Sequence, residues 1–446
     1  MSFLSLTDTD RDAMLAAIGA ASIEDLFRDI PEGVRLRREL DLEPALSELE
    51  LHSHLEELAR RNADTRSELS FLGAGMYDHY VPAVVDMVLQ RGEFLTAYTP
   101  YQPEMSQGVL QAIFEYQTAI CELTEMDVSN ASGYDGTTVA ADACYMAKHV
   151  TGRSRVVVTE ATSPQVRQVV KTYALGFGLE VVEVPHTDGV TDADRVAEAA
   201  QDAAAVIFQQ PNFFGCLEPG PELAAAAAGA GALPIAHVDP ISLGVLEAPG
   251  RYGCAIALGE GQGAGNALSF GGPHYGFLAC RSEHVRRMPG RIAGQTVDGE
   301  GRRGYVLTLA TREQHIRREK ATSNITTNQT LLAFGGLVYL TWLGPAGLRE
   351  LGETCMALSA YAKERLVDAG FDTVFPEQPT FKEFAVRVGR NARDVVHAAR
   401  EGGVHPGYAL SRSYEGLDDA LLVAVTEKRS TADIDRLVEV LSEVAR

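Results

Sequence analysis

The segment that says most about the chemistry of this chain is a glycine-rich turn between two apolar runs, residues 256–280. A strand, a glycine-rich turn and a returning strand form a layout typical of a pocket for pyridoxal phosphate. In such a pocket a lysine amine at the strand end holds the cofactor and passes it to an amine substrate. Residues 256–280 contain no lysine. The chain is therefore either a non-catalytic partner or a protein of another fold.

Two further segments could bind parts of the same cofactor. The sequence SGYDGTT, residues 132–138, precedes a helical pattern, and its glycines and free helix amides would favour a phosphate. A plain capped helix start explains these residues equally well. Asp239 ends an apolar run, where its carboxylate could pair with a protonated pyridine nitrogen. Because Pro240 follows, an ordinary helix N-cap is the simpler interpretation of this aspartate.

A compact polar loop, YTPYQPE, comes before an amphipathic helical pattern. Its prolines would fix the aromatic, amide and carboxylate groups of Tyr98, Tyr101, Gln102 and Glu104. Rigid groups of these types suit the positioning of a substrate and the handling of protons. Prolines and tyrosines also pack well in purely structural turns, so the residues alone favour neither interpretation.

Two lysines elsewhere in the chain could stand in for the missing one. Lys320 follows the mixed-charge run TREQHIRRE and does not lie at a strand end, which makes it a poor candidate for a covalent link. Lys148 lies inside the helical pattern CYMAKHV and is also a poor candidate. Because acids interrupt the basic run, a contact between subunits explains it better than a nucleic-acid patch.

Short β-rich runs alternate with helical patterns in the middle of the chain. The expected strands cover residues 155–159, 179–184, 204–209, 234–239, 254–258 and 275–280, and helices are expected at 163–176, 191–203 and 219–229. This alternation predicts an α/β fold with a mostly parallel, doubly wound sheet covered on both faces. Ligands then bind at the carboxyl ends of the strands.

We expect three parts along the chain. Residues 1–90 carry helical patterns interrupted by Pro31 and Pro44 and predict a helical N-terminal arm. Residues 91–328 hold the large α/β domain. After a long apolar helical pattern, residues 329–446 predict a smaller α+β domain with strands in TFKEFAVRV and ALLVAVTE.

Composition narrows the range of partners. The net charge of −22 repels phosphate backbones and argues against nucleic acid. The six cysteines form no CxxC pair, so neither a zinc site nor a disulfide framework is indicated. The N-terminal residues lack a basic leader, and the longest apolar run is shorter than the roughly 20 residues that span a bilayer. These features predict a cytoplasmic protein that does not enter a membrane.

Three motifs together resemble the P-protein of the glycine cleavage system. They are YTPYQPEMSQG, the run MPGRIAGQT and the run TREQHIRREKATSNI. The resemblance covers nearly the whole chain and is strongest with the lysine-free half, or separate first subunit, of that pyridoxal-phosphate-dependent glycine decarboxylase. It implies a fold-type I transferase-like architecture.

The resemblance also implies where the missing lysine belongs. Counting back from Pro273 places Gln262 at the position of the cofactor lysine. The lysine and the covalently bound cofactor are therefore expected in a second subunit of the same fold, with the active site near the interface. Besides the YTPYQPE loop, Arg291, Thr322 and Asn324 are expected to contribute to that site.

The family decarboxylates glycine and passes the aminomethyl group to the lipoyl arm of H-protein. The implied partners are thus a second P-protein subunit, lipoylated H-protein and glycine, and the isolated chain is expected to be inactive. Two alternatives stay open: a self-contained lyase or aminotransferase that uses Lys320 or Lys148, and a scaffold without catalysis.

Overall fold

The computed structural model describes residues 5–95, 98–325 and 328–445 in two compact units, Met1–Ala63 and Asp64–Arg446. The first unit contains helix α1 (Asp8–Ile18), short 3-10 turns and helix α2 (Glu48–Ala59). Ser47 and Glu50 cap α2 reciprocally, and Thr7 and Asp10 cap α1 in the same way. Beyond the expected break at Pro44, the helical arm forms a helix only from Glu48.

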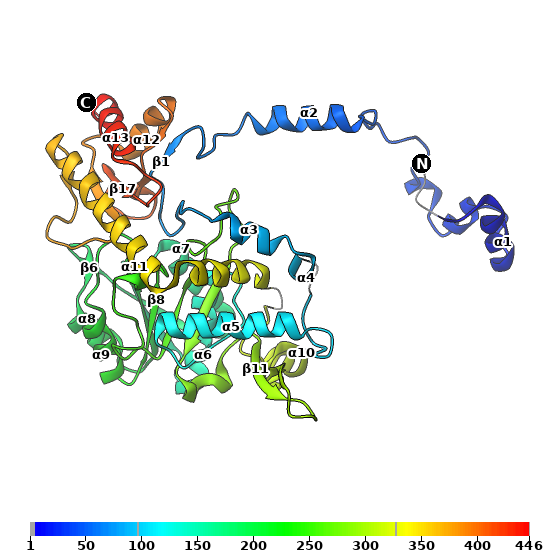
Figure 1. Cartoon of the computed structure of the whole chain (residues 1–446), viewed down its shortest axis with the longest axis horizontal. Helices are drawn as coiled ribbons and strands as arrows, with labels where there is room; N and C mark the ends of the chain where they lie inside the picture. The colour runs from blue at the N-terminus through cyan, green and yellow to red at the C-terminus, as the bar shows by residue number, and fades with distance from the viewer. Residues whose placement is uncertain (1–4, 96–97, 326–327, 446) are drawn as a thin grey trace. The chain divides into compact units, whose positions relative to one another are not determined.

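A seven-stranded sheet organises the second unit (Figure 1). The strands lie in the order β2 (Val128–Ser129), β10 (Gly276–Cys280), β9 (Ile256–Glu260), β8 (Leu233–Val238), β7 (Ala203–Gln210), β3 (Arg155–Thr159) and β4 (Glu180–Val184). The strands from β9 to β4 are parallel, whereas β10 is antiparallel to both its neighbours. The mostly parallel sheet predicted from the sequence is confirmed.

Helices cover both faces of this sheet because its strands are apolar on both sides. Successive side chains of a strand point to opposite faces, so Val156 and Val158 pack in one core and Val157 in the other. The first core includes residues of α6 (Gly136–Thr151) and α7 (Pro164–Phe177). The second core includes residues of α5 (Gln107–Thr124), α8 (Ala193–Ala199) and α9 (Gly220–Gly229).

The C-terminal part has its own antiparallel sheet. Its order is β13 (Asp372–Thr373), β14 (Glu383–Arg387), β17 (Ala420–Ala424) and β16 (Tyr408–Ala409). Apolar residues of α12 (Ala392–Glu401) and α13 (Thr431–Val444) pack against it. The remaining strands form three pairs: β1 (Leu69–Ser70) with β15 (Val404–His405), β5 (His186–Thr187) with β6 (Val190–Thr191), and β11 (Ile292–Val297) with β12 (Arg303–Thr308).

Helix α11 (Thr330–Asp368) runs from the large sheet to the small one (Figure 1). It is broken at Gly344, which has φ 61° and ψ −179°, just before Pro345. By length and composition alone α11 could cross a membrane, a test that core helices of soluble proteins also pass. Its first half contributes Phe334 and Tyr339 to packed cores, which accounts for its apolar character. Three short helices complete the unit: α3 (Ala83–Leu89), α4 (Gly92–Leu95) and α10 (Gln314–Arg317).

Candidate functional site

A cavity of about 400 Å³ opens beside the large sheet. Its walls come from the YTPYQPE loop, the end of β2, the start of α6, the turn before β11 and the segment before α11. The volume is large enough for a small ligand or an inserted group of a partner. Three segments that resemble the P-protein therefore line one cavity, although the first lies about 200 residues before the other two in the sequence.

Tyr101 and Arg291 contact each other across this cavity. The Nη2 atom of Arg291 donates to the hydroxyl of Tyr101 at 3.2 Å, and the guanidinium carbon lies 5.6 Å from the centre of its ring. The Nε atom of Arg291 lies 3.7 Å from Glu313, an ion-pair distance that is too long for a hydrogen bond. The ring of His315 meets that of Tyr101 edge on at 5.6 Å. Half of Tyr101 is exposed, so this group is held in place and still accessible.

The other residues expected at the site divide into two groups. Tyr98 and Thr322 line the cavity, Tyr98 almost fully exposed and Thr322 buried. Gln102, Glu104 and Asn324 are not among the lining residues. The peptide oxygen of Gln102 accepts from Met105 in the turn that leads into α5.

The cavity is unusual in the number of buried polar atoms that lack a partner within the described residues. Buried polar groups in native proteins are nearly always hydrogen-bonded, so a cluster of exceptions needs an explanation. Six such atoms belong to lining residues: Asn130 Oδ1, Ser132 Oγ, Asp142 Oδ1, Arg291 Nε, Arg312 Nε and Glu313 Oε1. The set contains both donors and acceptors, and a ligand or partner that enters the cavity could satisfy them.

The surroundings fix the position of Arg312 and shift the pKa of Asp142. Arg312 donates to the carbonyl oxygens of Met288 and Gly290, the latter at 2.8 Å, so its guanidinium is fixed on the turn before β11. Burial raises the pKa of Asp142 to about 7, and a hydrogen bond with Ser323 opposes that shift. A carboxyl group with such a pKa can gain or lose a proton near neutral pH.

Sequence reasoning missed four of the lining residues with unpaired atoms. Arg312 and Glu313 lie inside the run TREQHIRREKATSNI, so that motif was the available signal for them. Asn130 and Asp142 carry no local signal, because only the packing of β2 and α6 brings them to the cavity.

A second polar cluster lies at the carboxyl end of β8, where the sequence predicted a place for the pyridine nitrogen. Asp239 Oδ2 forms an ion pair of 2.6 Å with the ammonium of Lys382, and Oδ1 accepts from the peptide nitrogen of Ile241. Lys382 lies just before β14 and is 2% exposed. Its ammonium also lies 2.8 Å from His79 Nε2 and 3.6 Å from the centre of the Tyr77 ring. This lysine, and not Lys320, contacts the predicted cofactor position.

The turn at residues 132–138, which could bind a phosphate or simply begin a helix, leads into α6. Asp135 caps the helix by accepting from Thr138, as a plain N-cap would. The next free amide, Gly136, donates to the carboxylate of Glu260 at 2.9 Å, and the other oxygen of Glu260 accepts from Gln262 N at 3.0 Å. Burial raises the pKa of Glu260 to about 8, and the hydrogen bonds from these peptide N–H groups partly oppose that rise.

Gln262, at the expected lysine position, is 1% exposed and fully paired. Its Nε2 atom donates to the carbonyl oxygens of Tyr77 at 2.9 Å and Asn266 at 2.8 Å, and its Oε1 accepts from Tyr77 N at 2.8 Å. The space left beside Asp239 and Lys382 is about 20 Å³, room for about one water. The residues of this pocket therefore do not fit pyridoxal phosphate.

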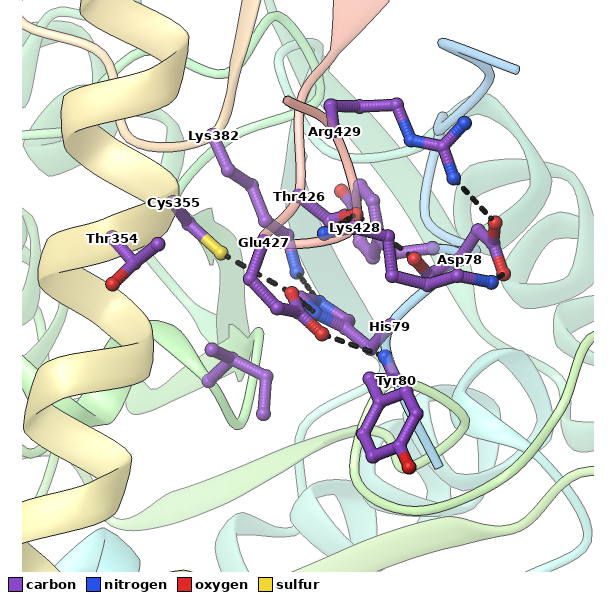
Figure 2. A network of polar contacts seen from close by, with 12 residues as sticks. Asp78, His79, Tyr80, Thr354, Cys355, Lys382, Thr426, Glu427, Lys428 and Arg429 are labelled. Carbon is purple, nitrogen blue, oxygen red and sulfur yellow. Dashed lines mark hydrogen bonds and ion pairs between the residues drawn. The ribbon is translucent and has the colours of Figure 1, made fainter. Parts of the chain in front are cut away.

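A network of charged groups continues from Lys382 to the C-terminal sheet (Figure 2). His79 accepts from Lys382 through Nε2, so it donates through Nδ1 to Glu427 at 2.7 Å. Burial and then the charge of Lys382 lower the pKa of His79. Burial acts to raise the pKa of Glu427, but His79 and peptide donors bring it down to about 2. A neighbouring link joins Asp78 to Lys428 at 2.7 Å.

His79, Cys355 and Glu427 place three potential metal ligands within 4.8 Å of one another. The ammonium of Lys382, 2.8 Å from the other nitrogen of His79, would repel a cation there. We assign no metal to this cluster. Lys148, the other lysine weighed above, donates to the carbonyl oxygens of Phe177 and Gly178 and so caps the end of α7.

Comparison with proteins of known sequence identifies the family. Residues 1–441 match the family described as glycine cleavage system P-protein. A probable glycine dehydrogenase (decarboxylating) subunit 1 from Carboxydothermus hydrogenoformans is 51% identical over 442 residues, covering 99% of each chain. A protein of the same description from Desulforamulus reducens is 47% identical over 446 residues, covering 100% of both chains.

Solved structures agree with this assignment. The crystal structure of a glycine decarboxylase (P-protein) of the glycine cleavage system, in inhibitor-bound form, matches with a TM-score of 0.91 and 43% identity over 100% of both chains. An alanine–glyoxylate aminotransferase from Nostoc sp. matches with a TM-score of 0.60 over 91% of this chain and 98% of its own, and at 17% identity it shows the fold alone. The fold is that of the fold-type I pyridoxal-phosphate enzymes. The chain belongs to the glycine cleavage system P-protein family.

Proposed function

We propose that this chain is subunit 1 of a heteromeric glycine decarboxylase, the subunit without a cofactor lysine, and that a second subunit binds the pyridoxal phosphate. The observation that carries the proposal is the contrast between two places in one chain. Gln262, at the lysine position, is fully paired, whereas the cavity beside Tyr101 holds six buried polar atoms without partners among the described residues. A chain of this kind supplies a wall to a site that another subunit completes.

The complex decarboxylates glycine and passes the aminomethyl group to the lipoyl arm of H-protein. Pyridoxal phosphate supplies an electron sink for the carbanion when it is bound. Arg291 and Arg312 offer unpaired Nε–H groups to an anionic group that enters the cavity. The contact between Arg291 and Tyr101 fixes both side chains before the ligand arrives, which lowers the entropic cost of binding.

The first unit, Met1–Ala63, supports a large contact with the second subunit. None of its described residues is buried, and sixteen large apolar side chains in it are exposed, from Leu6 to Leu58. Helices of 11 and 12 residues are marginal on their own in water. A standard interface buries roughly 800 Å² of each partner, and a run of exposed apolar side chains of this length suits such a contact.

A cytoplasmic location and H-protein as the acceptor are parts of the same proposal. The alternative of a self-contained lyase or aminotransferase is less favoured, because Lys148 caps a helix and Lys320 lies in a short exposed turn. A scaffold without any part in catalysis stays the second alternative, because a partner that enters the cavity could also satisfy its unpaired atoms.

Co-purification with the second subunit, followed by an assay of glycine-dependent bicarbonate exchange, tests the proposal. The isolated chain should be colourless after incubation with pyridoxal phosphate and dialysis, and exchange should appear only in the mixture. Arg291→Gln should lower exchange by about 100-fold with the complex intact, since a positioned charge is lost. Arg302→Gln, at an exposed arginine of the neighbouring hairpin, is the matched control. Exchange by the isolated chain would refute the division of labour.

A chain that starts at residue 64 tests the contribution of the arm. The six apolar cores lie wholly within residues 64–446, so the shortened chain is expected to keep its thermal unfolding midpoint. Gel filtration with the second subunit should show a complex at least tenfold weaker than that of the full chain. Equal association of both forms would contradict the role of the arm, and arm-dependent dimers of this chain alone would point to a second copy as its partner.

A further inference from the structure

We propose that the cofactor pocket of this chain is occupied by its own side chains, with Lys382 in place of the ring nitrogen, Glu260 in place of the phosphate and Gln262 in place of the lysine. This occupation is a property of the pocket of this subunit alone and is separate from the role of the chain in the complex. The pocket did not merely lose a lysine, because Asp239, the amide of Gly136 and the side chain of Gln262 all have partners within the chain.

The replacement of the ring nitrogen by Lys382 is the most complete of the three. A protonated pyridine nitrogen is a cation, and a buried aspartate is its natural partner. Here Asp239 holds the ammonium of Lys382 at 2.6 Å in a place where the lysine is 2% exposed. The same ammonium lies over the face of Tyr77, a favourable cation–π position. Lys382 thus supplies the positive charge that keeps Asp239 from being a buried, unpaired anion.

At the phosphate position, the carboxyl group of Glu260 takes the place of the phosphate. The N-terminus of α6 directs free amides toward the pocket, which suits an anion or another oxygen acceptor. Glu260 fills this position, since one of its oxygens accepts from Gly136 at 2.9 Å. A side chain at Gly136 would collide with the backbone of Glu260 at 2.7 Å, so the glycine permits this close approach. A phosphate could bind only after Glu260 had moved.

The side chains of Gln262 and Lys382 also connect parts of the chain that a bound cofactor would otherwise bridge. Gln262 pairs with the backbone of Tyr77, and Lys382 reaches from the small sheet to Asp239 on the large one. Through His79, the same ammonium is linked to Glu427 of the small domain (Figure 2). The pocket therefore fastens the two sheets and the segment around residue 77 together without a ligand.

Binding of pyridoxine 5′-phosphate to the isolated full-length chain tests the inference. This probe has the ring nitrogen and the phosphate but no aldehyde, so it forms no imine with surface lysines. Equilibrium dialysis should detect no saturable binding to the native chain up to 1 mM, an upper limit chosen to correspond to about −4 kcal/mol. Lys382→Ala should bind the probe at least tenfold more tightly than the native chain, and adding Asp239→Asn should abolish the gain. The control is Lys428→Ala, which breaks the ion pair with Asp78 outside the pocket and should gain no binding.

Tight binding to the native chain that depends on Asp239 would overturn the inference, as would the absence of any gain in a folded Lys382→Ala variant. If Lys382→Ala does not fold, a double-mutant cycle decides. Lys382→Met and Asp239→Asn should each lower the thermal unfolding midpoint, and the double variant should lose clearly less than the sum. Additive losses would show that the two groups do not depend on each other and would refute the exchange at the ring-nitrogen position.

Discussion

Replacing Gln262 by lysine restores the amine that the family uses, yet we expect it to destabilise the chain and not to create a cofactor site. The buried side chain of Gln262 forms three hydrogen bonds, two with Tyr77 and one with Asn266. A lysine has no acceptor for the peptide N–H of Tyr77, and an unpaired buried donor costs about 1–3 kcal/mol. Pyridoxal phosphate should not reach the new amine, because Lys382 and Glu260 fill the neighbouring positions.

The buried ammonium of the new lysine should cost more than the lost hydrogen bond. Burial without a counter-ion lowers the pKa of a lysine by up to about 3–5 units, and each unit is worth about 1.4 kcal/mol. Together with the lost hydrogen bond, Gln262→Lys should lower the free energy of unfolding by on the order of 5 kcal/mol at pH 7. The unfolded chain then binds more protons than the folded one, so the deficit should shrink by about 1.4 kcal/mol per unit as the pH rises from 7 toward 10.

Urea unfolding at pH 7 and pH 9 measures this deficit. Gln262→Met is the matched control, because it removes the same hydrogen bonds without adding a charge and should show a deficit that does not depend on pH in this range. Borohydride reduction after incubation with pyridoxal phosphate, followed by mass analysis of the peptide around residue 262, tests for an imine. A variant as stable as the native chain that forms this imine would refute both the energetic argument and the view that the pocket is filled.

Three further results are expected. Tyr101→Phe should lower bicarbonate exchange in the reconstituted complex by about 100-fold while gel filtration shows normal assembly; full activity in an intact complex would assign the loop a structural role. Asp142→Asn should stabilise the isolated chain at pH 8 and not at pH 4, because the pKa raised to about 7 makes the native aspartate increasingly destabilising as the pH rises from its unfolded pKa toward 7; equal effects at both pH values would contradict this. Glu427 has a pKa depressed to about 2, so its contribution of about 3 kcal/mol is present above its unfolded pKa and lost as the pH falls through 2. Thermal unfolding from pH 7 to pH 2 should show this loss in the native chain and a smaller loss in Glu427→Gln. The pKa of His79 is also lowered by folding, so His79 makes the chain less stable in the same direction, as the pH falls.

The fold could be predicted from the sequence because its signals are local. Strand β3 has the bounds expected from the apolar pattern, residues 155–159. Strands of valine and alanine between alanine-rich helices leave few alternatives to a doubly wound sheet. The antiparallel direction of β10 agrees with the strand, glycine-rich turn and returning strand expected at residues 256–280.

The candidate site could be predicted only in part. The YTPYQPE loop and Arg291 were found through motifs, and the structure places Tyr101 against Arg291. Lys382 was missed although the chain has only six lysines, because it precedes a strand of the small sheet 120 residues after Gln262. A local pattern shows which group is absent from a pocket. It does not show which distant group has replaced it, since that depends on tertiary packing.

The filled pocket is therefore stronger evidence than the missing lysine that this chain does not bind the cofactor itself. A lost lysine alone would leave Asp239 and the amides of α6 without partners, and unpaired buried groups of that kind are costly. Asp239, Glu260 and Gln262 are all paired within the chain, whereas Asn130, Asp142 and other groups around the Tyr101 cavity have atoms without a partner among the described residues. Stability alone would favour pairing in both places. The unpaired groups that line the Tyr101 cavity are therefore ones whose partners we expect outside this chain, and contact with the second subunit should first be sought at these residues.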